Sequence, residues 1–246
     1  MAPAPVHLWR VELDVGAETE AQLLGELAAD ELTRAEGFGS AQARRRFVVA
    51  RGTLRGLLGD LLGEVPQSIA IEEGASGKPR LAGAGHRLGF NVSHSGDLAL
   101  ICIAEGAEVG VDLERLRPVL DAVAIARRRF APEEACFVEE GEGADVDRRF
   151  LTCWTRKEAL AKATGAGLSF DLRSFAVPLD EQPSGVVSLD TPGKEQPQRW
   201  SIFDVPMGSE YVAALALPAS AEVRRAPGPR HFETRERRDS NPRPPA

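Results

Sequence analysis

The feature that limits the fold most strongly is an apolar run of seven residues, Leu98 to Ala104, directly after a turn signal. That signal, Ser95-Gly96-Asp97, follows a stretch of strand-forming residues that begins at Leu88 and ends at His94. Two such stretches joined by a short turn predict a pair of neighbouring strands. Because the second stretch is apolar throughout, we expect it to be buried.

The periodicity of apolar residues elsewhere predicts helices and strands that alternate in blocks. Helices are expected at 19–35, 40–62, 122–130, 133–139 and 147–164, and strands at 6–15, 69–72, 109–114, 169–177, 185–189, 199–205 and 211–217. Ser40 and Pro132 are typical of helix starts, and Gly63 and Gly165 are typical of helix ends. Helices followed by strands, twice over, indicate the α+β class.

Length and composition exclude several kinds of protein. The 246 residues suffice for two small domains, and no apolar run approaches the roughly 20 residues that a membrane span needs. The first residues lack the basic and apolar regions of a signal peptide, so we expect a cytoplasmic protein that does not contact membranes. From residue 219 the chain is rich in Pro and Arg and poor in apolar residues, which predicts disorder.

The net charge and the reactive residues argue against several functional classes. The formal net charge is −7, and an acidic chain argues against general nucleic-acid binding. The three cysteines and four histidines match no zinc-ligand spacing, and no G-x-S-x-G nucleophile motif is present. Gly77-Lys78-Pro79 lacks the hydroxyl residue of a phosphate-binding P-loop, so it predicts only a turn that presents one lysine.

Two segments carry carboxylates at spacings that suit a divalent cation. In the strand expected at 109–114, a period of two puts Asp112 and Glu114 on one face, about 7 Å apart. In the helix expected at 147–164, Glu158 and Lys162 are four residues apart and therefore neighbours, with Lys157 next to Glu158. Oxygen ligands without His or Cys favour Mg²⁺ or Mn²⁺. Taken alone, each segment also fits an ordinary solvated strand edge or a surface ion pair.

Basic residues that could contact phosphate groups lie in three other places. The helix expected after Ser40 is rich in arginine and includes Arg46, Lys78 lies in a turn, and His94 lies at a strand end. Such an arginine run is usually a solvated helix face, and a lone histidine is usually structural, so both interpretations stay open for each residue.

Four of these segments, taken together and in order, resemble the 4′-phosphopantetheinyl transferases of the long single-chain type that activates polyketide and non-ribosomal peptide synthetases. The segments are Gly77-Lys78-Pro79, Phe90-Asn91-Val92-Ser93-His94-Ser95, Val109-Gly110-Val111-Asp112-Leu113-Glu114 and Trp154-x-x-Lys157-Glu158-Ala159-x-x-Lys162. The resemblance implies two similar α+β halves, residues 1–106 and 107–218, which form a pseudo-dimer with the active site in the cleft between them. The tail, residues 219–246, lies outside the resemblance and is expected to be disordered.

The resemblance also implies an activity. The protein would transfer the 4′-phosphopantetheine arm of its co-substrate, coenzyme A, to a serine of an apo acyl or peptidyl carrier protein, releasing adenosine 3′,5′-bisphosphate. We expect it to act as a monomer, with Arg127, Arg128 and Arg129 at the rim of the carrier-docking surface. The alternatives are a non-catalytic module that binds coenzyme A or a carrier protein, and a different Mg²⁺-dependent phosphoryl enzyme.

The resemblance assigns a role to each matching residue. The Mg²⁺ ligands would be Asp112, Glu114 and Glu158, and Glu158 would also act as the base for the serine hydroxyl. The pyrophosphate would lie along Lys157 and Lys162, the latter stabilising charge during catalysis. The remaining coenzyme A contacts would come from Ser93, His94, Arg46 and Lys78, with Ser93 and His94 near the 3′-phosphate.

Overall fold

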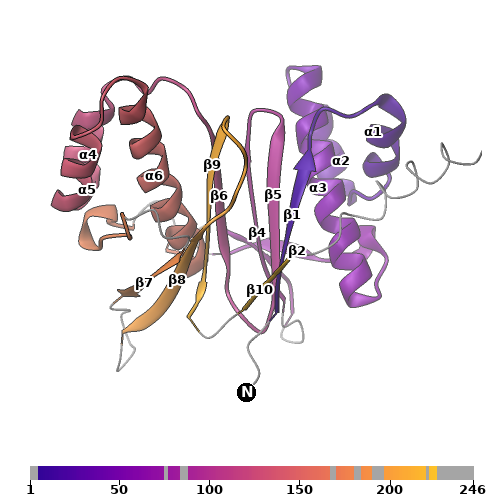
Figure 1. The fold of residues 1–246 in the computed structure, drawn as a ribbon. Coiled ribbons are helices and arrows are strands. Elements are labelled where there is room, and N and C mark those ends of the chain that lie inside the picture. Colours follow the sequence, from indigo (N-terminus) through magenta and orange to yellow (C-terminus); the bar gives the residue numbers. More distant parts are fainter. Residues whose placement is uncertain are drawn as a thin grey trace, which may run out of the picture. The chain divides into compact units, whose positions relative to one another are not determined.

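The computed structural model describes residues 5–74, 77–83, 88–166, 170–179, 184–189, 197–219 and 222–225 (Figure 1). The chain divides into two compact units, one made of Met1–Leu8 and Ile71–Arg224 and the other of Trp9–Ala70 and Arg225–Ala246. These boundaries differ from those of the predicted halves, 1–106 and 107–218, because strands on either side of residue 106 pack together in the same unit. The division into similar halves therefore stays a prediction.

Within the described residues, strands that lie mostly in the larger unit form two four-stranded sheets and a short hairpin. The first sheet has the strand order β10-β1-β5-β4, formed by β1 (Pro5–Glu12), β4 (Leu88–Ser95), β5 (Leu98–Glu105) and β10 (Glu222–Arg225). The second has the order β6-β9-β8-β7, formed by β6 (Gly110–Arg115), β7 (Ser184–Leu189), β8 (Gln198–Asp204) and β9 (Tyr211–Pro218). The hairpin pairs β2 (Ile71–Glu73) with β3 (Pro79–Leu81). Both β4 and β6 are thus edge strands of their sheets.

The predicted strand pair at 88–104 is confirmed. Strands β4 and β5 are antiparallel, with Ser95 opposite Leu98, and the turn between them consists of Gly96 and Asp97. Gly96 has a φ of 59°, a conformation that glycine adopts without steric cost. All of β5 except its last residue is buried, as the apolar run predicts.

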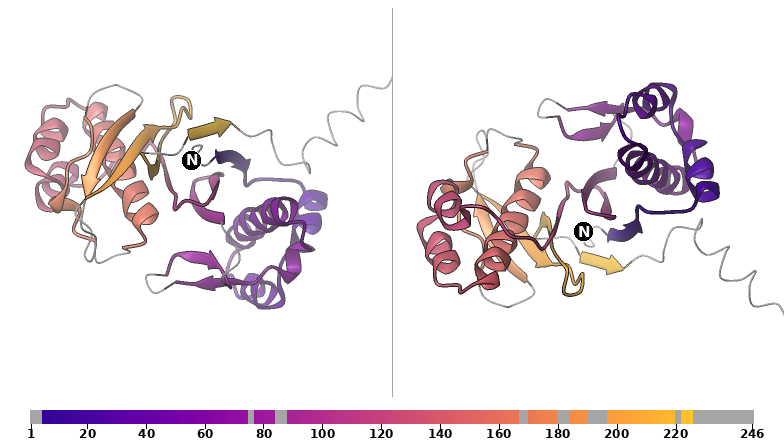
Figure 2. Two further views of the ribbon diagram at one scale, coloured as in Figure 1. Left: turned by 90° about the horizontal axis from the view of Figure 1, so that it is seen from below. Right: turned by 90° about the horizontal axis from the view of Figure 1, so that it is seen from above.

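Three helices of this unit pack beside the second sheet: α4 (Ala122–Arg129), α5 (Pro132–Glu139) and α6 (Ala144–Thr164). Helix α6 lies along β6, β9 and β8, and α4 and α5 pack against α6 (Figure 1; Figure 2 shows two further views). The predicted end of α6 is confirmed, because Gly165 follows the helix in the left-handed conformation with a φ of 67°.

Contact between α6 and β6 is closest at Gly110. A Cβ atom at this position would lie 2.1 Å from the carbonyl oxygen of Ala159 and 2.4 Å from the backbone nitrogen of Ala163. Only glycine therefore allows this approach, and the small side chains of Ala159 and Ala163 keep the helix surface flat. Since residues two apart in a strand share a face, Asp112 lies on the same side of β6 as Gly110, toward α6.

The smaller unit is built around α3 (Ala41–Leu62), against which α1 (Ala17–Leu24), α2 (Ala29–Glu36) and the 3₁₀ turn η1 (Pro66–Ser68) pack. The prediction of a single helix at 19–35 is wrong, because α1 ends before Gly25 and α2 starts separately at Ala29. The Glu31 carboxylate caps the start of α2, where it accepts the N–H of Ala28 at 3.2 Å. The predicted cap of α3 is confirmed, since Ser40 Oγ accepts the N–H of Ala43 at 3.1 Å.

Two other predictions need correction. The strand expected at 169–177 is absent from its described part, 170–177, where Leu172–Ser174 form the 3₁₀ turn η3. Here the Asp171 carboxylate accepts the N–H of Arg173 at 3.0 Å, and such local bonds favour a turn over an extended strand. Disorder from residue 219 onward is wrong for Glu222–Arg225, which form β10, whereas residues 226–246 lie outside the described residues.

None of the helices described here combines the length and the apolar character that crossing a membrane requires.

Candidate active site

The centre of the candidate site is an ion pair between β6 and α6. Lys162 Nζ lies 2.6 Å from Asp112 Oδ1 and also donates to the carbonyl oxygen of Val111 at 3.3 Å. The Asp112 side chain is 8% exposed and the Lys162 side chain 29% exposed. The close approach at Gly110 explains the pairing, because it brings the last turn of α6 onto the face of β6 that carries Asp112.

A serine from the neighbouring strand β4 completes this centre. Ser93 Oγ donates to Asp112 Oδ1 at 2.9 Å and accepts from Lys162 Nζ at 3.1 Å. Two strands and one helix, far apart in sequence, therefore meet at one carboxylate.

The two other predicted carboxylates interact electrostatically with Asp112. Partial burial raises the pKa of Glu158, and the negative charge of Asp112 raises it further. The pKa of Glu114 is raised by the same two causes in the same order, against a hydrogen bond from Ser95 Oγ at 3.2 Å that lowers it. Three carboxylates that disfavour one another's charge share this part of the molecule.

The donor set suits a hard divalent cation, although within the described residues no three such side chains are arranged closely enough to hold one as they stand. Asp112 Oδ2 is buried and has no hydrogen-bond partner among the described residues. An unsatisfied buried carboxylate oxygen is costly, and a bound cation would satisfy it. The same cation would relieve the mutual repulsion of Asp112, Glu114 and Glu158, so the residues present fit Mg²⁺ or Mn²⁺ chemically.

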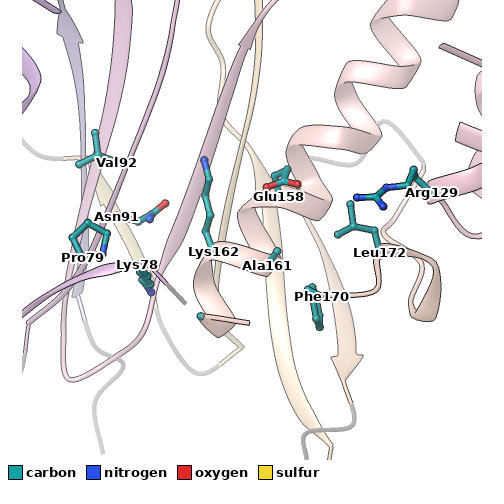
Figure 3. Close-up of a pocket in the computed structure, with 12 residues that line it drawn as sticks. Lys78, Pro79, Asn91, Val92, Arg129, Glu158, Ala161, Lys162, Phe170 and Leu172 are labelled. Atoms are coloured by element: carbon teal, nitrogen blue, oxygen red, sulfur yellow. The ribbon is translucent and has the colours of Figure 1, made fainter. Parts of the chain in front are cut away.

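A pocket of about 310 Å³ opens beside this centre (Figure 3). Its lining mixes charged and apolar groups from several elements: Gly77, Lys78, Pro79, Asn91, Val92, Arg129, Glu158, Ala161, Lys162, Gly165, Phe170 and Leu172. In Figure 3, Glu158 and Lys162 project from α6, and the guanidinium of Arg129 is turned toward Glu158. Residues from both predicted halves, 1–106 and 107–218, thus line one pocket.

Lys78, the lysine that the sequence predicts in a turn, also lines this pocket. Its Nζ lies 2.6 Å from Glu108 Oε2 and 3.0 Å from the carbonyl oxygen of Val109. The Lys78 side chain is 14% exposed and that of Glu108 is 65% exposed, so the carboxylate can move into solvent when a stronger anionic partner reaches Lys78.

Lys157 lies elsewhere, in the protein interior. Its side chain is fully buried, and Nζ lies 2.7 Å from Glu134 Oε2 and 2.6 Å from each of the carbonyl oxygens of Leu172 and Phe175. The ammonium also lies 4.1 Å from the ring centroid of Phe175. Burial lowers the pKa of Lys157, and Glu134 opposes this shift. With its donors engaged and no exposed surface, Lys157 has no path to a ligand in this arrangement.

His94 and Arg46 are the remaining predicted residues, and His94 is the one that belongs to the same unit as this pocket. His94 is exposed on β4 and does not line it. Arg46 lies on α3, in the smaller unit. Other arginines of α3 form ion pairs inside that unit, Arg44 and Arg45 with Glu20 and Arg51 and Arg55 with Glu31.

Three residues near the site have contacts that the sequence did not predict. Arg129, for which a docking rim stays a prediction, lines the pocket and lowers the pKa of Glu158 against the larger effect of burial. Asn91 and Ser95 received no role, although both contact β6. A detectable signal did exist, because Asn91, Ser93 and Ser95 form a polar alternation with a period of two on a strand.

Comparison with known proteins identifies the class to which this site belongs. Residues 108–216 match the family model of the 4′-phosphopantetheinyl transferase superfamily. The chain is 36% identical over 216 residues to the 4′-phosphopantetheinyl transferase HetI of Nostoc sp., and the match covers 86% of this chain and 87% of that protein. It is 31% identical over 201 residues to a 4′-phosphopantetheinyl transferase of Bacillus subtilis, covering 77% of this chain and 86% of that protein. The chain therefore belongs to the 4′-phosphopantetheinyl transferase superfamily.

Proposed function

We propose that Asp112, Glu158 and Lys162 carry out the transfer of 4′-phosphopantetheine from coenzyme A to a serine of an apo acyl or peptidyl carrier protein. As a member of its superfamily, the protein is a 4′-phosphopantetheinyl transferase. The single observation that supports these three residues most strongly is the Asp112–Lys162 ion pair beside a pocket that Glu158 also lines.

The reaction requires that the serine hydroxyl be positioned beside the pyrophosphate of coenzyme A and that the pyrophosphate charge be neutralised. The serine oxygen attacks the β-phosphorus of coenzyme A, and the bond from that phosphorus to the bridging oxygen breaks, so adenosine 3′,5′-bisphosphate leaves. In this proposal, the carboxylate of Glu158 accepts the serine proton and Lys162 stabilises the charge that develops on the pyrophosphate oxygens. Lys162 is suited to this role because its side chain is 29% exposed, whereas that of Lys157 is fully buried.

We also propose that Asp112, Glu114 and Glu158 bind Mg²⁺, or Mn²⁺ in its place. When bound, such a cation neutralises pyrophosphate charge and orients the phosphoryl group. The fit rests on the oxygen donors and on the unpartnered Oδ2 of Asp112. Chelation with EDTA should stop transfer, and added Mg²⁺ or Mn²⁺ should restore it.

The proposed activity is tested by intact-mass analysis of candidate apo carrier proteins incubated with coenzyme A, Mg²⁺ and this protein. The expected result is one added phosphopantetheine group on serine for each adenosine 3′,5′-bisphosphate released. A different Mg²⁺-dependent phosphoryl enzyme would give other products. A non-catalytic module would bind without releasing nucleotide, and the superfamily match does not favour it.

Three further expectations complete the proposal. We expect coenzyme A to lie in a cleft between two similar halves, which is supported by a pocket lined from both. We expect the protein to act as a monomer in the cytoplasm. The acceptor is expected to be a small carrier domain that docks near this pocket.

Lys78, His94 and Arg46 are expected to contribute mainly to coenzyme A affinity. Lys78→Ala should raise the KM for coenzyme A about tenfold, because a contact to the non-reacting end of a substrate contributes mostly to binding. His94→Ala and Arg46→Ala should act in the same direction, and dephospho-coenzyme A should bind the parent protein more weakly. Arg80→Ala is the matched control, since Arg80 is an exposed residue in a surface pair with Glu72. Equal binding of the two coenzymes would refute a phosphate-recognition role.

Arg128 is expected to contribute to carrier docking. Arg127 pairs with Glu139 and Arg129 lines the pocket, so Arg128 is the exposed residue of the triplet best suited to test docking by itself. We expect the carrier domain to be acidic, so a negative charge in the docking surface should repel it. Arg128→Glu should therefore raise the KM for the carrier about tenfold and leave the KM for coenzyme A unchanged. Arg199→Glu is the control, because Arg199 is an exposed residue of β8. If both constants move together, this docking face is wrong.

A further inference from the structure

We propose that Ser93 and Ser95 are positioning residues, which hold the carboxylates of Asp112 and Glu114 from the neighbouring strand β4. This inference rests on the proposed function for its catalytic consequence, but its structural basis is independent. It gives Ser93 a different role from the 3′-phosphate contact expected from the resemblance.

Side chains of β4 replace a missing backbone ladder along the outer edge of β6. The N–H groups of Val111, Leu113 and Arg115 donate to Asn91 Oδ1 at 2.9 Å, Ser93 Oγ at 3.2 Å and Ser95 Oγ at 3.0 Å. The donors on β6 and the acceptors on β4 each advance by two residues from one bond to the next, so the two strands run in the same direction where they meet. We call these three bonds the side-chain ladder.

The side-chain ladder supplies hydrogen-bond acceptors to buried N–H groups of β6. Among the described strands, β6 lies at the edge of its sheet and pairs with β9. Val111 and Leu113 are fully or almost fully buried, and buried backbone N–H groups without acceptors are costly. Short polar side chains supply the acceptors at a spacing that a strand with a period of two provides.

Each serine in the ladder also makes a second bond, to a carboxylate. Ser93 Oγ donates to Asp112 Oδ1 at 2.9 Å, and Ser95 Oγ donates to Glu114 Oε2 at 3.2 Å. In both cases the serine accepts from one residue of β6 and donates to the residue before it. The same unit therefore repeats two residues further along and fixes both carboxylates relative to the β6 backbone.

The hydroxyl of Ser93 is fully used in this arrangement. A serine hydroxyl has one donor and two acceptor positions. Its donor goes to Asp112, and its acceptors take the N–H of Leu113 and the ammonium of Lys162. A contact with phosphate would require the single proton that Asp112 already receives. These three bonds place Ser93, which is 6% exposed, to hold Asp112 and Lys162.

The test compares Ser93→Ala, Ser95→Ala and Ser93→Thr in the full chain, with Ser188→Ala, a change at an exposed residue of β7, as control. Turnover is measured with coenzyme A and with dephospho-coenzyme A, and amide hydrogen exchange of β6 is measured without substrate. We expect Ser93→Ala to lower kcat about tenfold with both substrates, the effect of losing one hydrogen bond to a charged group. The KM ratio of the two coenzymes should stay unchanged. Exchange at Leu113 should accelerate, and Ser93→Thr, which keeps a hydroxyl, should restore most of the kcat.

Two results would overturn the proposal. One is a Ser93→Ala variant in which only the affinity for coenzyme A falls, that for dephospho-coenzyme A is kept, and Leu113 exchange is unchanged, since this identifies a phosphate contact. The other is a Ser95→Ala variant with parental kcat and parental exchange at Arg115. If the parent protein modifies no carrier, the proposed function fails, but the exchange data still decide whether the ladder exists. If Ser93→Ala does not fold, Ser95→Ala decides the proposal through its kcat and its exchange at Arg115.

Discussion

Asp112→Asn is expected to reduce phosphopantetheine transfer by about a thousandfold or more, because removal of a metal-binding charge costs several kcal/mol of transition-state stabilisation. The substitution keeps the shape of the side chain and its Oδ1 acceptor for Ser93 and Lys162, so the fold should be retained. It removes the charge that Lys162 and a cation both need. Glu158→Gln should have an effect of similar size, because the amide can neither accept the serine proton nor bind the cation as a carboxylate does.

Turnover of each variant is measured by intact mass on one apo carrier protein, and the fold is checked by thermal unfolding. Glu72→Gln is the matched control, because Glu72 is an exposed carboxylate paired with Arg80 at the surface. This variant should keep parental turnover. Parental turnover in Asp112→Asn, or turnover of the parent protein in EDTA, would show that the metal and catalytic roles proposed here are wrong.

Lys157→Met is expected to destabilise the protein by about 3–5 kcal/mol, because it leaves the buried carboxylate of Glu134 without its cation. For a chain of this length, the loss corresponds to a fall in Tm of roughly 10 °C. Glu134 also accepts the N–H groups of Ala131 and Val177, each at 2.8 Å, so the pair ties α5 and α6 to the segment around η3. That segment supplies Phe170 and Leu172 to the pocket.

The same measurement separates a structural role from a ligand contact. Below its lowered Tm, folded Lys157→Met should keep a KM for coenzyme A within about twofold of the parent value, since loss of a structural pair removes no substrate contact. Lys157→Met combined with Glu134→Gln should lose less stability than the two single changes summed, because the double variant buries no unpaired charge. An unchanged Tm together with a much weaker affinity for coenzyme A would instead support the pyrophosphate contact that the resemblance implied.

The sequence by itself determined most elements and the chemistry of the site. A period of two placed Asp112 and Glu114 on one face of a strand, and a spacing of four placed Glu158 and Lys162 on one face of a helix. These are local properties, because they depend only on the geometry of one strand or one helix. Glycine and serine at element ends were equally informative, as Ser40, Gly63 and Gly165 show.

Only the tertiary structure decided which charged residues are buried and which reach the pocket. Lys157 is adjacent to Glu158 in sequence, but neighbours in a helix point about 100° apart, and α5 supplies the carboxylate that takes Lys157 into the interior. The side-chain ladder likewise requires the edge strands of two sheets to meet, a contact that no local pattern predicts. The approach of α6 to β6 depends on Gly110 meeting Ala159 and Ala163, some fifty residues away in sequence. Long-range packing therefore assembled the site from residues that local patterns had identified separately.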